Sequence, residues 1–329
     1  GTALGPYSPG SAYVLLHHYM GEVDSTVGAW GYARGGMGSI TKAMASSFKS
    51  KNGEIKAGSP VTKILIKNNK SYGLVLENGD EIYADKIVSN LDVKRTFLKV
   101  VEEKELPNDF YKAVKNFKIR GSSGKLNIAL DDLPIWKSIP EGDPAGTGDL
   151  HITQNIEEME GAYDDWKDGK WSQFPYVDMC IPSINDPTMA PQGKHYMSVF
   201  IQYVPYNLAD GGWTEEKRLE FGKHVMSRIG NYSTNFNDII NHAEIRTPKE
   251  LEAEVGLTEG NIFQGELTMD QLMFNRPVPG YAQYKTPIKN LYMCGSSTHP
   301  GGGVMGAPGA NAAREILKDL NKKISTHYI

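Results

Sequence analysis

The fold is decided by the stretch LYMCGSSTHPGGGVMG at residues 291–306, near the end of this 329-residue chain. Its apolar start, Leu291 to Cys294, predicts a short buried strand. Glycines follow closely, and a backbone without side chains lets a ligand lie against peptide N–H groups. The pattern therefore predicts a cofactor loop between this strand and a helix, whose apolar residues recur at helical spacing: Ala310, Ala313, Ile316, Leu317 and Leu320.

A plain glycine-rich surface loop is the alternative interpretation, although such loops rarely combine many glycines with His, Pro, Val and Met just before a helix. Gly301, Gly303 and Gly306 also satisfy the pattern G-x-G-x-x-G. A primary dinucleotide fingerprint needs a second strand and an acidic residue about twenty positions further on, for which the sequence before Ile329 leaves no room. We therefore expect another part of the nucleotide site elsewhere.

A second glycine-rich helix start lies near the beginning of the chain. Gly35-Gly36-Met37-Gly38 leads into Ser39, the expected N-cap, and apolar residues follow on one helical face up to Phe48. Three strands are expected next, at 61–67, 72–76 and 81–89, with Asn78-Gly79 as a hairpin turn. This three-stranded meander would return the chain to a nucleotide-binding sheet.

The sequence pattern changes between about Asp92 and about Gln271, where strand-like and helix-like segments alternate. Mixed strands and helices here predict an α+β domain, an antiparallel sheet covered by helices. The polar, glycine-bearing stretch 141–170 is expected to form loops. The expected strands are 125–130, 176–181 and 196–204, and the expected helices are 110–117, with Pro107 at its first position, and a helix after Thr214 that carries Phe221, Val225 and Ile229.

Composition narrows the class of protein. The net charge of −4 and a pI of about 6.1 leave no basic footprint for nucleic acid. No apolar run approaches the roughly 20 residues that cross a bilayer, which leaves only contact with a membrane surface open. Cys180 and Cys294 are too few for a disulfide framework and fit a reducing compartment. We expect a cytoplasmic protein, or one of the mitochondrial matrix in a eukaryote.

The sequence contains no group of residues typical of an acid–base catalytic site or of a metal site. Neighbouring histidines such as His17-His18 diverge on a helix and chelate poorly, so no metal site is expected. The pairs Asp131-Asp132 and Asp164-Asp165 have polar neighbours and are interpreted as solvated turn residues. Cys294 fits a small buried hydrophobe better than a reactive thiolate.

Four segments resemble the phytoene desaturase-like FAD oxidoreductases. They are GAWGYARGGMGSITKAMASS at 28–47, CIPSINDPTMAPQGKH at 180–195, GNIFQGELTMDQLMFNRPVPGY at 260–281, and LYMCGSSTHPGGGVMGAPGANAA from 291 onward. The resemblance implies FAD as cofactor and an incomplete, glutathione-reductase-like Rossmann domain beside a mixed or antiparallel substrate domain. It implies hydride transfer to flavin from a small apolar substrate, carotenoid-like or isoprenoid-like, because flavin itself accepts the hydride.

The resemblance also implies which residues contact FAD. Val61 could equally be an ordinary strand residue, since β-branched residues begin strands regardless of ligands. His299 is the candidate for contact with flavin or substrate, with bracing of the loop as its alternative. Ser296 stands where many relatives carry an acidic residue that binds the ribityl chain. The expected contacts are Gly35, Gly36, Met37, Val61, Ser89, Gly295, Ser296, His299, Pro300, Gly301, Gly302, Gly303, Val304 and Met305.

One departure from the family concerns what precedes Gly1. Family members begin with a strand, a glycine turn and a helix that hold the adenosine and pyrophosphate, and this sequence opens without them. We expect a truncated protein whose uncovered apolar edge favours self-association into a homo-oligomer. The expected division is 1–34 in the substrate domain, 35–91 in the FAD domain, 92–271 in the substrate domain and 272–329 in the FAD domain.

Two other functions stay open. A flavin-dependent isomerase would use reduced flavin without net turnover, and an interaction protein would have kept the fold and lost the chemistry. Aromatic residues could line a tunnel for a long apolar substrate, but such side chains are normally buried in the core without any ligand. They are Trp30, Tyr32, Trp213, Phe274, Tyr281 and the aromatic positions of 196–206.

Overall fold

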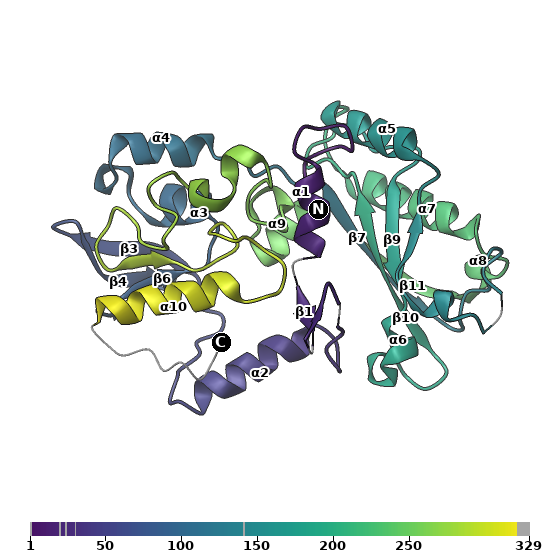
Figure 1. Cartoon of the computed structure of the whole chain (residues 1–329), viewed down its shortest axis with the longest axis horizontal. Helices are drawn as coiled ribbons and strands as arrows, with labels where there is room; N and C mark the ends of the chain where they lie inside the picture. The colour runs from purple at the N-terminus through teal and green to yellow at the C-terminus, as the bar shows by residue number, and fades with distance from the viewer. Residues whose placement is uncertain (1, 20, 24, 30, 141, 321–329) are drawn as a thin grey trace.

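The computed structural model describes residues 2–19, 21–23, 25–29, 31–140 and 142–320, so that Trp30 lies outside the described residues. The elements form two groups side by side (Figure 1). One group is built on a five-stranded sheet, and the other holds a three-stranded meander and a two-stranded sheet. The structure is therefore mixed α/β, with antiparallel pairing in all but one of the sheets, as the sequence predicts.

The five-stranded sheet has the strand order β11-β7-β10-β9-β8, and every neighbouring pair is antiparallel. Along β10 the side chains of Met197, Val199 and Ile201 are fully buried, as their alternation predicts. Phe221 and Val225 of helix α7 are fully buried in the same cluster. The strands are β7 (Ser123–Leu130), β8 (Leu150–Ile152), β9 (Tyr176–Cys180), β10 (His195–Gln202) and β11 (Ile240–Arg246), and α7 spans Glu215–Gly230.

The expectation of loops over 141–170 is wrong. This stretch contains the edge strand β8 and the helix α5 (Ile156–Lys167). The Asn155 side chain caps α5 by accepting from the Glu158 N–H at 2.8 Å. Only Ala162 and Trp166 of the helix are buried, one turn apart. So narrow an apolar stripe leaves most of the helix polar, which hid it from the sequence pattern.

The second group begins with the antiparallel meander β3 (Val61–Lys67), β4 (Lys70–Leu76) and β5 (Glu81–Tyr83). The third expected strand, 81–89, is divided, because its end leaves the meander as β6 (Ile87–Ser89). Strand β6 pairs in parallel with β12 (Leu291–Met293). The meander therefore returns the chain to the strand that precedes the glycine loop, as predicted.

Two predicted helix starts need correction. Helix α2 (Gly38–Lys49) is capped at Met37, and Ser39 lies inside the first turn, where its hydroxyl donates to the Gly36 carbonyl at 2.7 Å. Pro107 is the residue before α4 (Asn108–Asn116), where its missing N–H is not needed. Both helices form where the periodicity predicts them, but α2 begins two positions earlier than predicted and α4 one position later.

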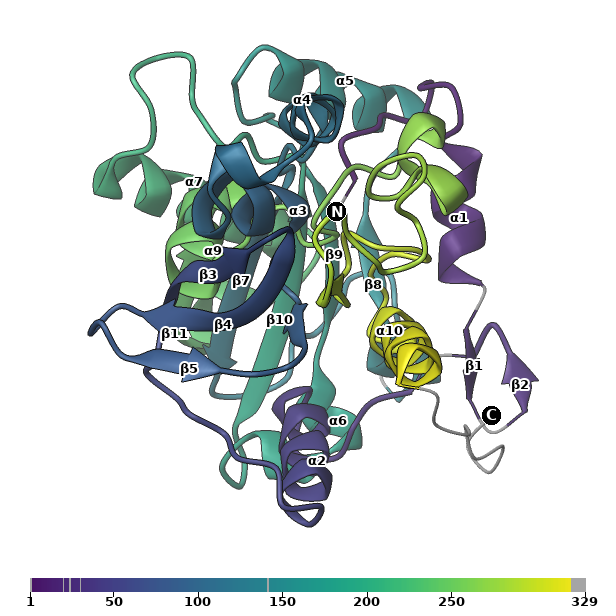
Figure 2. The same cartoon turned by 90° about the vertical axis from the view of Figure 1, so that its left-hand side faces the viewer.

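The core of the second group joins distant segments of the chain. Ile87 and Met293 of the two-stranded sheet pack with Phe97, Phe110 and Val278. Figure 2 shows α10 (Ala307–Asp319) beside this core, with α2 along the lower edge of the molecule. Among the described residues, no helix is long and apolar enough to cross a membrane. The remaining elements are α1 (Ala12–His18), β1 (Glu22–Val23), β2 (Thr26–Val27), α3 (Val93–Arg95), the π-helical turn Thr96–Val100, α6 (Pro182–Asn185), α8 (Phe236–Ile239) and α9 (Pro248–Val255).

Candidate flavin site

The carboxyl ends of β6 and β12 meet at one edge of the two-stranded sheet. The Cys294 N–H donates to the Ser89 carbonyl at 2.9 Å, which places the first residues of the glycine loop beside Ser89. A Cβ atom on Gly295 would lie 2.5 Å from the carbonyl oxygen of Asn90, so only glycine fits there. The structure thus brings Ser89 and Gly295 together, as predicted. Ligands of open α/β sheets bind outside the carboxyl ends of parallel strands.

The inner part of the loop is tied to its surroundings by buried hydroxyls. Ser297 is fully buried, donates to the Gln264 carbonyl at 2.6 Å and accepts from the Val93 N–H at 3.0 Å. The Thr298 hydroxyl donates to the Gly295 carbonyl at 2.8 Å. The Gly301 N–H then donates to the Thr298 carbonyl at 2.8 Å. These contacts fix the turn before any ligand binds.

Arg276 is the largest fully buried side chain of the described protein, and the sequence pattern did not single it out. Its guanidinium donates to the Ser296 carbonyl from Nε at 3.0 Å and from Nη2 at 2.8 Å. Nη2 also donates to the Phe263 carbonyl at 2.8 Å, and Nη1 donates to the Glu266 carbonyl at 3.1 Å. Burial lowers the pKa of Arg276 to about 10, which still leaves it charged at neutral pH. A buried cation therefore braces the loop from behind.

His17 holds the loop from the opposite side. Its Nε2 donates to the Gly302 carbonyl at 2.8 Å, so the neutral ring carries its proton on Nε2. Burial lowers the pKa of His17 more than this hydrogen bond raises it. The Nδ1 atom is buried without a hydrogen-bond partner among the described residues. The sequence presented this histidine only as half of a poor chelating pair, and no local signal connects it to a loop 285 positions away.

The outer part of the loop is open. Gly303 and Gly306 are exposed, and Val304 is 72% exposed. Within the described part of the chain, the backbone N–H groups of residues 302–307 and of Gly309 donate no hydrogen bond, and Pro308 between them has no N–H. These amides lead directly into the 13-residue helix α10, whose N-terminus favours negative charge. Free amides at a helix start are the donors that a phosphate or a flavin pyrimidine edge accepts from.

Comparison with known proteins shows the family to which this chain belongs. The model of the family described as flavin containing amine oxidoreductase matches residues 1–317. The chain belongs to this flavin-containing amine oxidoreductase family. The prediction of FAD as the cofactor is thereby confirmed at the level of the family, which is described by its flavin. The assignment of the glycine loop to the flavin stays a prediction.

Three curated relatives are similar over almost the whole chain. The mouse protein named pyridine nucleotide-disulfide oxidoreductase domain-containing protein 2 is 39% identical, over 97% of this chain and 56% of its own length. Prolycopene isomerase 2 of an Oncidium hybrid is 27% identical over 93% and 49%, and the lycopene-forming phytoene desaturase of Paracoccus is 24% identical over 96% and 60%. The chain therefore spans about half the length of the curated relatives it matches.

A solved structure shares the fold. An oxidoreductase from Methanosarcina mazei superposes with a TM-score of 0.53 at 20% identity, over 87% of this chain and 55% of that chain. The likeness confirms the predicted fold class, an FAD-oxidoreductase fold of mixed α/β structure.

The backbone of His299 joins the loop to α10, and the two predicted roles of its side chain both stay predictions. The His299 carbonyl accepts from the Tyr284 hydroxyl at 2.8 Å, and Asn311 of α10 donates to the same hydroxyl at 2.8 Å. This chain of contacts joins the loop to α10. His299 and Pro300 are half-buried and Met305 is 46% exposed. Direct contact of His299 with flavin or substrate stays a prediction.

The other predicted flavin segment is arranged differently. Gly35 and Gly36 both adopt a φ of 82°, which favours glycine, and the Gly35 N–H donates to the Asp186 carboxylate at 2.6 Å. This bond joins two of the family-like segments, 28–47 and 180–195. Met37 is 53% exposed. Among the described residues, no hydrogen bond connects Gly35, Gly36 or Met37 to the loop that begins at Gly295.

Val61 and Ser89 occupy ordinary structural positions. Val61 is half-buried and opens β3 opposite Leu76. The Ser89 hydroxyl lies 2.8 Å from the Thr96 hydroxyl and accepts from the Leu91 N–H at 3.3 Å. The side chain of Ser89 is therefore engaged inside the protein, which leaves its backbone as the part that would meet a cofactor. Burial raises the pKa of Cys294, in keeping with a neutral thiol.

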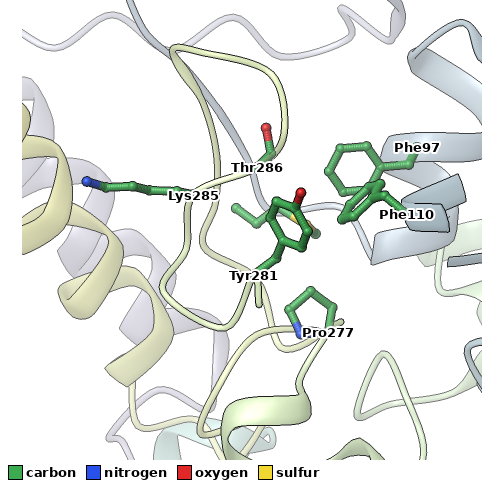
Figure 3. Close-up of a pocket in the computed structure, with 7 residues that line it drawn as sticks. Phe97, Phe110, Pro277, Tyr281, Lys285 and Thr286 are labelled. Carbon is green, nitrogen blue, oxygen red and sulfur yellow. The ribbon is translucent and has the colours of Figure 1, made fainter. Parts of the chain in front are cut away.

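An apolar hollow lies behind the strand that carries the loop (Figure 3). The rings of Phe97, Phe110 and Tyr281 face one another there, with Pro277 beside them and the amine of Lys285 pointing away. The Phe97 and Phe110 centroids, and those of Phe110 and Tyr281, are 4.8 Å apart. The hollow contains none of the expected flavin contacts and is part of the packing that supports β12. Among the described residues, no group of three or more His, Cys, Asp or Glu could hold a metal ion.

Proposed function

We propose that this chain is the flavin-loop and substrate-binding portion of an FAD-dependent dehydrogenase that acts on an apolar, isoprenoid-like substrate. The observation that carries the proposal is the open run of amides from Gly302 to Gly309 beside the carboxyl ends of β6 and β12. Bound FAD would supply the hydride acceptor. The protein would hold, orient and shield the reactants, which contributes much of the rate in such reactions.

The residues of the loop divide this work. Gly295 and Gly302 let the backbone approach a ligand, and the N-terminus of α10 favours negative charge. Arg276 keeps the Ser296 carbonyl turned inward and holds a positive charge below the loop. Ser296 would donate a hydrogen bond to the ribityl chain, more weakly than the charge-assisted bond an acidic residue forms.

The substrate class rests on the names of relatives. Phytoene desaturase and prolycopene isomerase are named for apolar polyenes. The chain also has aromatic and aliphatic side chains outside its core, such as Tyr32 at 52% exposure and Phe274 at 74%. Both observations support an apolar substrate over a sugar or a nucleotide.

The test uses the protein expressed from its complete reading frame and reconstituted with FAD. Anaerobic mixing with candidate isoprenoids should bleach the flavin absorbance, and adding an electron acceptor should restore it. The Ser296→Asp variant should bind FAD more tightly and Ser296→Ala more weakly, if Ser296 reaches the ribityl chain. A protein that binds no FAD after reconstitution contradicts the proposal and favours the interaction protein.

A flavin-dependent isomerase is the second candidate, favoured by the prolycopene isomerases among the relatives. It would convert its substrate only after the flavin is reduced, and it would consume no electron acceptor. Steady-state measurement of acceptor reduction against product formation separates the two functions.

A further inference from the structure

The five-stranded sheet has one face without helices, and this face carries charge. Its other face is apolar and packs on α7, through residues such as Leu126, Val177 and Val199. Cross-strand partners share a face. The register therefore aligns one residue from each strand in a row across the helix-free face: Arg246, Lys125, Phe200, Asp178 and His151. In Figure 1 this face turns toward the group that contains the glycine loop.

Lys125 is a partly buried ammonium without a carboxylate partner. Its Nζ donates to the Ser198 hydroxyl on the neighbouring strand. No Asp or Glu among the described residues lies within ion-pair distance of it, whereas the exposed Lys194 pairs with Asp131 at 2.8 Å. Burial lowers the pKa of Lys125, and the charges of Cys180 and Asp178 only partly oppose this. The ammonium therefore has unused donors in a partly dry setting.

Asp178 is the complementary group on the other side of Phe200. Burial raises the pKa of Asp178, which shows that its carboxylate is incompletely solvated. Its Oδ1 lies 3.7 Å from His151 Nδ1, and that nitrogen also contacts the Tyr176 hydroxyl at 2.7 Å. Because β7 and β9 are separated by β10, their backbones are about 10 Å apart. A donor and an acceptor thus flank an aromatic ring.

The row lies next to one of the predicted flavin segments. The Tyr32 hydroxyl donates to Asp149 at 3.1 Å. Because Asp149 immediately precedes the edge strand β8, this bond places the phenol of Tyr32 at the β8 end of the row. Burial and the charges of Asp149, Cys180 and Asp178 raise the pKa of Tyr32. Three residues later the chain reaches Gly35, whose N–H is held by Asp186. The Asp178 side of the row, which is next to β8, is therefore the side nearest to the segment that the sequence assigns to the flavin.

We propose that Lys125, Phe200 and Asp178 form a subsite for the hydroxyl group of an otherwise apolar substrate, an inference that rests on the proposed function. The Lys125 ammonium donates a hydrogen bond to the hydroxyl oxygen, and the Asp178 carboxylate accepts a hydrogen bond from the hydroxyl O–H. The Phe200 ring packs against the adjoining hydrocarbon. A carboxylate ligand would be repelled by Asp178 and an amine by Lys125. A pure hydrocarbon would leave both charged groups desolvated and unpaired, which is costly.

Equilibrium dialysis measures the affinity of the FAD-loaded protein for labelled farnesol and for the matched hydrocarbon β-farnesene. Farnesol should bind roughly 10 to 100 times more tightly, the range expected for hydrogen bonds to charged groups. Lys125→Met should lose most of this preference, because farnesol loses a donor and farnesene no longer desolvates an unpaired ammonium. Lys194→Met is the matched control, since Lys194 is an exposed lysine immediately before β10 with its own partner, Asp131, and it should keep the preference.

Two further variants keep the test decisive if Lys125→Met does not fold. Asp178→Asn and Ser198→Ala should each reduce the preference several-fold. Equal binding of the two compounds, no binding of farnesol, or a preference that survives in these variants overturns the subsite. If farnesol is preferred but no isoprenoid bleaches the flavin, the subsite stands and the dehydrogenase falls. If farnesene bleaches the flavin as fast as farnesol, the dehydrogenase stands and the subsite falls.

Discussion

The two groups of elements differ in how much apolar surface their own side chains cover. We call the group built on the five-stranded sheet the sheet half, and the group with the meander, the β6–β12 sheet and the glycine loop the loop half. In the sheet half, helix α7 buries Phe221, Val225 and Ile229 against the strands. Helix α2, which the sequence assigns to the FAD domain, has no buried residue, with Met44 64% exposed and Phe48 52% exposed. Helix α10 buries only Pro308 and Ala312. Each half therefore has a core of its own, but α2 and the loop half also present apolar side chains that the described residues do not cover.

A matched pair of substitutions tests this difference most strongly. Phe221→Ala should lower the free energy of unfolding by about 3–5 kcal/mol, because the ring is fully buried. Phe48→Ala should cost less than about 1 kcal/mol, because half of its ring is already in water. Urea unfolding curves measure both. Equal costs would show that α2 is covered in solution, and the contrast between the halves would be lost.

Arg276 tests whether the loop half depends on a buried charge in addition to its own apolar core. Arg276→Met should lower the free energy of unfolding by about 3 kcal/mol, since it leaves the buried carbonyls of Ser296 and Phe263 without donors. FAD affinity should fall as well. Arg314→Met is the control, because Arg314 contacts only the neighbouring Asn311 side chain through Nη1. Wild-type stability in Arg276→Met would contradict the bracing role.

Two glycines of the loop half provide a sharper local comparison. Gly295→Ala should cost about 2 kcal/mol and weaken FAD binding, because its Cβ would lie 2.5 Å from the Asn90 carbonyl. Gly309→Ala in α10 meets nothing within 4 Å and should raise stability by up to about 1 kcal/mol. Thermal unfolding with and without FAD measures both. A harmless Gly295→Ala would remove the argument that close approach requires glycine there.

The smallest expected effect is the pH dependence that His17 contributes. Because burial lowers its pKa, the unfolded chain takes up a proton that the folded chain resists as the pH falls below about 6.5. The free energy of unfolding should therefore be fully retained above that pH and decline below it, by on the order of 1 kcal/mol per pH unit. His17→Gln keeps a donor for the Gly302 carbonyl and should flatten this decline. An unchanged pH profile in His17→Gln would show that His17 is not the group responsible.

Local pattern predicted much of both halves. The alternation from Tyr196 to Ile201 marked β10, and the four-residue spacing from Phe221 to Ile229 marked α7. The strand, glycine turn and helix from Leu291 onward were visible because each carries its own periodicity or composition. Helix α5 was missed because its buried stripe is only two residues wide.

The rest of the site depends on contacts between distant residues. Gly302 is held by His17, 285 positions away, and Gly35 by Asp186, 151 positions away. Arg276 stood inside a segment recognised by its resemblance, yet nothing in its local sequence shows that it binds carbonyls without an acidic partner. Such contacts are fixed by tertiary packing, which single-sequence periodicity does not contain. The domain boundaries and the direct flavin contacts stay predictions for the same reason.

Hydrogen exchange of the protein from its complete reading frame, compared with and without FAD, tests the central claim most directly. FAD should slow exchange of the amides of residues 302–307 and of Gly309, Pro308 having no amide hydrogen, while the paired amides of β10 should exchange at an unchanged rate. Unchanged exchange from Gly302 to Gly309 in a protein that demonstrably holds FAD would contradict the assignment of this loop to the flavin.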